Sequence, residues 1–255
     1  MLAIAGSFYL VSTYAFVLFC IVLGVRLVRL SRRTGARPEL YLGSALCLMG
    51  GVGYGILITM SLSRGWFGEA GMAWIPGMSL LGKGLHDIGV LFMITFVVTV
   101  FRPTERWARA LAAVMVGALV VGYVGHAITD GFREAQPTTL WYWLGFATIG
   151  TLPLWNATEA FLYHGQMRKR AALGLADPMV ANRFLLFGVA STFSALAVWT
   201  VSIPSLLQIP LDRQMTFISF TLSLTAVWGI GAIGSYWLAF FPPAWYARRV
   251  GAKTA

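Results

Sequence analysis

The sequence predicts an all-α, polytopic membrane protein with seven transmembrane helices in a single domain, residues 1–255. Hydrophobic residues make up 58% of the 255-residue chain and charged residues only 11%, whereas a soluble domain has about 25% charged residues. The apolar residues are grouped in long runs, and a helix needs about 20 such residues to cross a bilayer. Basic residues are concentrated between alternate runs. A chain with so few charges cannot cover a surface that faces water.

Seven apolar runs give the expected spans. Their length and continuous apolar character favour helices over the alternating strands of a membrane barrel. The runs are residues 3–28, 40–62, 80–101, 107–129, 138–163, 184–207 and 216–241.

The first four runs carry local signals that support helices. No basic residue precedes the first run, and arginines follow it, which is not the charge order of a cleavable signal peptide. In the second run, Gly51 and Gly55 have the spacing that lets two helices approach closely. The connection between the third and fourth runs, residues 102–106, is short enough to make these helices antiparallel neighbours.

The last three runs contain more polar residues. The fifth includes Pro153, which we expect to kink the helix. The sixth and seventh runs carry hydroxyl side chains toward the predicted outer face, and hydroxyls of this kind often bond neighbouring helices. Pro242 and Pro243 end the seventh run.

The distribution of positive charge predicts the orientation. Fifteen lysines and arginines lie in segments that an outside N-terminus would put in the cytoplasm, and four lie on the other side. This asymmetry predicts an outside N-terminus, a cytoplasmic C-terminus and a multi-pass location in a bacterial cytoplasmic (inner) membrane. It also accounts for the net charge of +10. We expect the basic residues to contact anionic lipid headgroups at the inner face, and we expect no nucleic-acid partner.

A polar group in the stretch GKGLHDIG opens the third span. Lys83 and Asp87 are four residues apart on a helix and can pair, and His86 is adjacent. If the span begins near Leu80, these residues lie at its outer end. On the neighbouring fourth span, His126 and Asp130 would lie at similar depth. The five residues predict an outward-facing ligand-binding cluster.

Three alternatives remain open for this cluster. Lys83 can be an interfacial lysine that Asp87 neutralises, with the histidines bound to loops or headgroups. A proton relay, or a metal or haem site at His86 and His126, is also compatible, although no third ligand is in register. We predict no cofactor.

The fifth span carries a second polar group, in TLPLWNATEAFLYHGQMRKR. Asn156 and Glu159 share one helix face inside the apolar region, and His164 follows near the inner boundary. A charge at this depth costs at least about 2.5 kcal/mol, so Glu159 should be paired, neutral or in contact with water. The three residues are candidates for proton or ion coupling, and a structural salt bridge is the alternative.

Tryptophans near the centres of the later spans are candidates for the walls of an apolar ligand pocket. We assign Trp199 and Trp228 to the ligand-binding set on this basis. Packed core is the alternative interpretation for such residues.

Two cytoplasmic stretches, VFRPTERWARAL and RKRAALGLADPMVANRFLLFG, resemble segments of uncharacterised bacterial seven-helix membrane proteins. The topology is similar to that of rhodopsins and G-protein-coupled receptors. A microbial rhodopsin carries its retinal lysine in the middle of span seven, and residues 216–241 contain no lysine. Covalently bound retinal is therefore not expected.

These features favour a receptor-like or sensory module that binds a small molecule from the outer side. The sequence shows no catalytic motif, so we expect binding rather than enzymatic activity. Signalling would then pass to a partner protein through the basic inner loop, residues 165–183. A proton-coupled transporter using Glu159 and a non-catalytic subunit of a larger energy-converting membrane complex are the alternatives.

Overall fold

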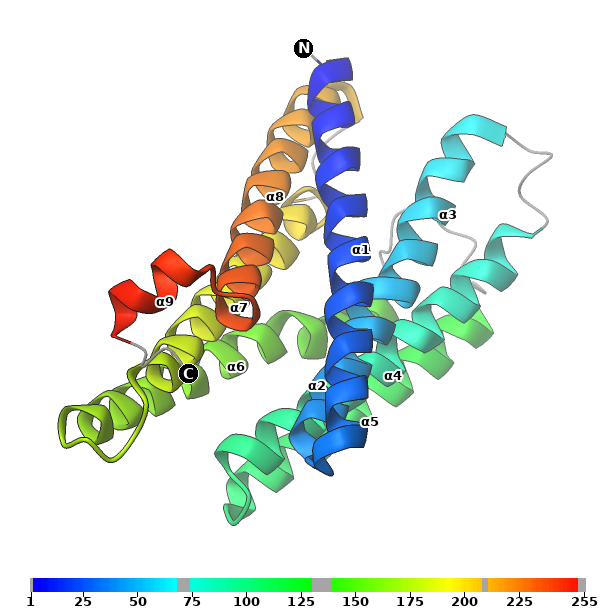
Figure 1. Cartoon of the computed structure of the whole chain (residues 1–255). Coiled ribbons are helices and arrows are strands. Elements are labelled where there is room, and N and C mark those ends of the chain that lie inside the picture. Colours follow the sequence, from blue (N-terminus) through cyan, green and yellow to red (C-terminus); the bar gives the residue numbers. More distant parts are fainter. Residues whose placement is uncertain (1, 68–73, 130–138, 208–210, 252–255) are drawn as a thin grey trace. The chain divides into compact units, whose positions relative to one another are not determined.

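The computed structural model describes residues 2–67, 74–129, 139–207 and 211–251, and the regular structure in these ranges is entirely helical (Figure 1). The elements are α1 (Leu2–Thr34), α2 (Arg37–Ala45), the π-helix η1 (Leu46–Gly53), α3 (Tyr54–Phe67), α4 (Ile75–Phe101), α5 (Arg106–Thr129), α6 (Leu140–Ala172), α7 (Pro178–Leu206), α8 (Leu211–Phe240) and α9 (Ala244–Val250).

Six helical segments of the described chain are long and apolar enough to cross a membrane, which indicates a multi-pass membrane protein. They are Ser7–Thr34, Arg37–Met60, Ile75–Phe101, Arg106–Thr129, Pro178–Ile203 and Phe220–Phe240. The predicted fifth span also forms a helix, α6, but polar residues such as Asn156 and Glu159 reduce its apolar character. The count of seven spans and the orientation of the termini therefore remain predictions.

The chain forms two compact units, to which α1 and α6 both contribute. The α4 unit is Thr13–Ile149, and the α7 unit combines Met1–Ser12 with Gly150–Ala255. Each unit is described by itself below.

In the α4 unit, α2, η1 and α3 follow one another without a break and pack tightly against α1. A Cβ atom added to Gly51 would lie 2.7 Å from Cγ1 of Ile21, and one added to Gly55 would lie 3.2 Å from Cγ1 of Val17. The close helix approach predicted from the spacing of Gly51 and Gly55 is confirmed.

The same continuous segment also packs against α4, on another face. A Cβ atom on Gly53 would lie 2.5 Å from the backbone nitrogen of His86, and one on Gly89 would lie 2.8 Å from Cα of Met49. The backbones of η1 and α4 are therefore in direct contact, which only glycine at these positions permits.

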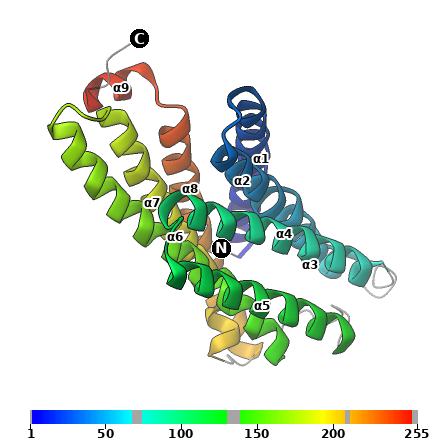
Figure 2. The same cartoon turned by 90° about the horizontal axis from the view of Figure 1, so that it is seen from below.

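In the α7 unit, α7 and α8 lie side by side, as Figures 1 and 2 both show. Their interface is largely aromatic. Phe193 and Trp228 stack with ring centroids 5.9 Å apart, and Phe187 meets Tyr236 edge-on at 5.7 Å. Ring pairs of this kind contribute beyond their buried area.

Several helices begin earlier than the apolar runs predicted, and the local sequence explains the starts of α7 and α4. Helix α7 begins at Pro178, where the Asp177 side chain caps it by accepting a 2.8 Å hydrogen bond from the Met179 nitrogen. Helix α4 begins at Ile75 rather than near Leu80, with a proline in its first turn. Proline is favoured there because the first helical N–H groups have no partner within the helix.

Candidate functional site

The position of GKGLHDIG within α4 differs from the expected one. Because α4 begins at Ile75, Asp87 is the thirteenth of its 27 residues. Lys83, His86 and Asp87, which we call the α4 centre, therefore lie near the middle of a helix of membrane-spanning length, and not at its end. Lys83 is the ninth residue of α4 and therefore lies further from the end of its helix than the apolar run predicted.

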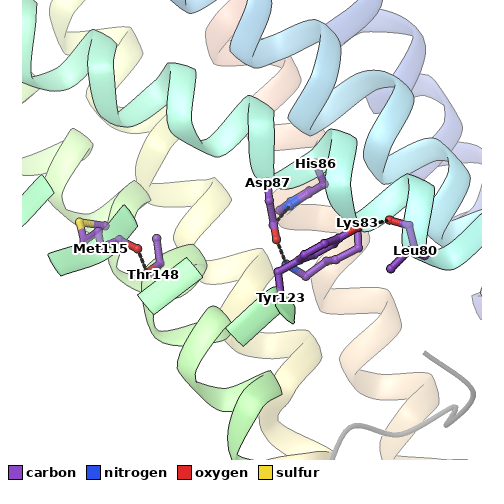
Figure 3. A network of polar contacts seen from close by, with 7 residues as sticks. All are labelled: Leu80, Lys83, His86, Asp87, Met115, Tyr123 and Thr148. Atoms are coloured by element: carbon purple, nitrogen blue, oxygen red, sulfur yellow. Dashed lines mark hydrogen bonds and ion pairs between the residues drawn. The ribbon is translucent and has the colours of Figure 1, made fainter. Parts of the chain in front are cut away.

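The Lys83 and His86 side chains both contact the Asp87 carboxylate (Figure 3). Lys83 Nζ forms an ion pair with Oδ2, and His86 Nδ1 donates to Oδ1 at 3.1 Å. The exposed fractions of the side chains are 17% for Lys83, 12% for His86 and 9% for Asp87. The attraction between Lys83 and Asp87 offsets part of the cost of burying their two charges.

The α4 centre retains hydrogen-bonding capacity that the described residues do not use. A lysine ammonium has three hydrogens to donate, and Lys83 donates only to Asp87 within the described chain. His86 uses Nδ1, and no described residue forms a hydrogen bond with Nε2. Two donors and one ring nitrogen therefore remain for water or a ligand.

Tyr123 of α5 adjoins the α4 centre and was not identified from the sequence. Its Oη donates a 3.2 Å hydrogen bond to the Leu80 carbonyl, and it would lie 3.1 Å from a Cβ on Gly84. In Figure 3 the Tyr123 ring is drawn beside the Lys83 side chain. The short connection between spans was the available signal, because it makes α4 and α5 antiparallel neighbours.

His86 of α4 and His126 of α5 lie at different heights along these two neighbouring helices. Tyr123 lies opposite Leu80 and Gly84 of the antiparallel α4, so residues after Tyr123 lie toward the beginning of α4. His126 is three residues further along α5, about 4.5 Å, in the direction away from His86. His126 is buried, with 9% exposed, and the predicted site residue Asp130 lies outside the described residues.

The η1 π-helix brings an uncommon backbone geometry to the α4 centre. Gly53, its last residue, contacts the backbone of His86. Helices with i→i+5 bonding are rare and are frequently found at functional sites. The α4 centre and η1 are therefore structurally linked through His86.

The second predicted group lies in the α7 unit and is held by several hydrogen bonds. Asn156 Nδ2 donates to Ser191 Oγ at 3.0 Å, and Trp155 Nε1 donates to Glu159 Oε1 at 3.2 Å. Asn156 is 2% exposed and Glu159 4% exposed, and Asn156 Oδ1 accepts no hydrogen bond from the described residues. His164 Nδ1 donates to the Ala181 carbonyl at 2.7 Å.

The predicted pocket tryptophans both belong to the α7 unit. Trp199 is 37% exposed, and its Nε1 donates to the Gly150 carbonyl at 3.1 Å. Trp228 stacks on Phe193. Each therefore has a local packing role, and their part in a ligand site remains a prediction.

Metal ligands are not clustered in the part of the chain that the structure describes, where no group of three or more His, Cys, Asp or Glu residues could hold an ion. Comparison of the chain with protein-family models, curated proteins and solved structures finds no match. The functional argument therefore depends on the geometry of the chain itself.

Proposed function

We propose that the chain is a receptor-like membrane protein that binds a small polar molecule at the α4 centre. The supporting observation is a buried ionic group near the middle of α4 with unused donors on Lys83 and an unused nitrogen on His86. Ionisable residues inside membrane helices are rare and usually functional. A ligand that accepts from Lys83 and contacts His86 Nε2 would satisfy groups that are costly to leave without partners.

The contact between η1 and α4 supplies a means of response. A ligand that displaces His86 would also displace the backbone of α4 against Gly53, because the two backbones touch. Closely packed interfaces do not deform continuously, so a small shift there changes the packing of whole helices.

The proposal retains the seven-span topology, with α6 as the fifth span. The N-terminus would be outside and the C-terminus in the cytoplasm of a bacterium, in accord with the asymmetry of positive charge. The partner protein would contact the basic segment 165–183.

The test is ligand-dependent thermal stabilisation of the purified full-length protein across a panel of amino acids, organic acids and sugars. A ligand at 100-fold excess over its Kd stabilises the folded state by about 2.7 kcal/mol, which raises Tm by about 5–10 °C for a protein of this size. We expect Asp87→Asn to abolish this shift. Thr95→Ala, on the same helix, is the matched control and should keep it. A compound that stabilises wild type and Asp87→Asn equally would place the site elsewhere.

A proton-coupled transporter is the second candidate, favoured by the buried Glu159 and Asn156 beside Pro153 of α6. In this function Glu159 would take up and release the coupled proton. Proteoliposomes with an imposed pH gradient provide the test, in which Glu159→Gln should abolish proton-driven uptake. Glu105→Gln, at an exposed acid between α4 and α5, should leave it intact. Equal uptake by wild type and Glu159→Gln would remove this role.

A further inference from the structure

One end of the α7 unit carries a strongly basic surface, which we call the basic face. Its six side chains are all exposed, and none forms an ion pair with a residue that the structure describes. The only acid among residues 164–184 and 241–251 is Asp177, whose carboxylate caps α7. The basic face consists of Arg168, Lys169, Arg170, Arg183, Arg248 and Arg249.

Helix α9 is held at this end by two hydrogen bonds between the same pair of side chains. Asn182 Nδ2 donates to Tyr246 Oη at 3.0 Å, and Tyr246 Oη donates to Asn182 Oδ1 at 3.2 Å. Asn182 precedes Arg183 at the start of α7, and Figures 1 and 2 both show α9 beside this end of the unit. The bond therefore holds Arg248 and Arg249 near the other basic residues.

Exposed aromatic residues accompany the basic face. Trp245 of α9 is 59% exposed, and Trp237 near the end of α8 is 49% exposed. Helix α9 contains no buried residue. Exposed tryptophans next to arginines, at the end of an apolar helix, are typical of the membrane–water interface.

Chain length puts α9 at headgroup depth if α8 crosses the membrane. The candidate span ends at Phe240, and three residues separate it from α9. Three residues reach at most about 10 Å, and the headgroup layer on each side is about 5–8 Å thick. A helix tethered so closely cannot extend far into the aqueous phase.

We propose that the basic face, with α9, is a docking surface for anionic phospholipid headgroups. The arginines pair with phosphate oxygens, and Trp245 inserts among the headgroups and the upper acyl chains. The Asn182–Tyr246 bond positions α9 for this contact. The inference is independent of the ligand proposed for the α4 centre. It assigns the basic side chains of segment 165–183 to lipid and leaves only the other residues of that segment to the partner protein.

The test measures phospholipid binding by the full-length protein in neutral detergent, by native mass spectrometry with equal phosphatidylglycerol and phosphatidylcholine. Wild type should retain phosphatidylglycerol preferentially. Each arginine near the surface contributes about fivefold to anionic-lipid affinity, so Arg248→Gln/Arg249→Gln should weaken phosphatidylglycerol binding about 25-fold. Tyr246→Phe keeps every charge but loses both hydrogen bonds to Asn182, and we expect a smaller loss of the same preference.

The matched control is Arg106→Gln/Arg109→Gln, which removes the same charge from exposed positions at the start of α5. These arginines are also expected at the inner headgroups, but they belong to a group of three basic residues and not six, so the loss of preference should be clearly smaller. Three results would overturn the proposal: no preference in wild type, equal losses in the two double variants, or an undiminished preference in Arg248→Gln/Arg249→Gln. The last result would favour an acidic protein as the occupant.

Discussion

The helices within each unit pack through different kinds of contact. In the α4 unit, glycines bring the helix backbones into contact, and an ion pair with an attached histidine is enclosed beside that contact. In the α7 unit, the described helices meet through aromatic rings and neutral hydrogen bonds, such as Phe193–Trp228 and Asn156–Ser191. Two backbones in contact cannot move apart without shifting a helix, whereas side chains in contact can adopt another rotamer. We therefore expect the α4 unit to tolerate substitution less well.

The largest effect is expected for Lys83→Met, which leaves Asp87 as a buried charge without its counter-ion. Breaking such a pair costs about 3–5 kcal/mol. The double variant Lys83→Met/Asp87→Leu removes both charges and should recover most of the loss. Thermal unfolding in detergent measures both. If the single variant is as stable as wild type, the pair is not the buried contact that the structure describes.

Gly53→Ala is expected to have the next largest effect. The new Cβ would lie 2.5–2.7 Å from backbone atoms of His86, which cannot rotate away. Overpacking of this kind costs about 1–3 kcal/mol, and it should also change ligand binding at the α4 centre. Gly77→Ala, where a Cβ meets nothing within 4 Å, should be neutral or slightly stabilising. Equal melting temperatures for the two variants would contradict backbone contact.

Ser191→Ala tests the α7 unit at a buried position. It removes the acceptor of the Asn156 amide and leaves that side chain buried without its bond, at a cost of about 1 kcal/mol. Asn156→Leu removes the polar group altogether and should cost less than Ser191→Ala. The reverse order, measured by thermal unfolding, would show that the amide has another essential contact.

Tyr123→Phe is expected to have the smallest effect on stability. Its hydrogen bond to the Leu80 carbonyl is exposed, and hydrogen bonds between membrane helices contribute about 0.6 kcal/mol on average. A loss similar to that of Lys83→Met would mean that Tyr123 belongs to the α4 centre itself.

The sequence was a good guide to the helices, because a membrane imposes long apolar runs on the chain. All seven runs lie within helices, apart from one or two residues at an end, but several helices extend beyond the runs. The helix starts at Ile75 and Pro178 were missed because proline and polar residues there end an apolar run without ending a helix. The prolines themselves, and Asp177 before α7, were the signals.

The candidate site could be predicted only in part. The i,i+4 spacing of Lys83 and Asp87 is enough to predict their pair, because both lie on one helix. The contact of Gly53 with His86 and the approach of Tyr123 depend on how separate helices pack, which their spacing along the chain does not determine.

The most direct test of the central claim compares ligand-induced stabilisation in wild type and in Lys83→Met/Asp87→Leu. The double variant should fold, because it has lost both buried charges, and it should show no ligand-induced increase in Tm where wild type gains about 5–10 °C. A double variant that folds and retains the full increase would contradict the assignment of the α4 centre as the binding site.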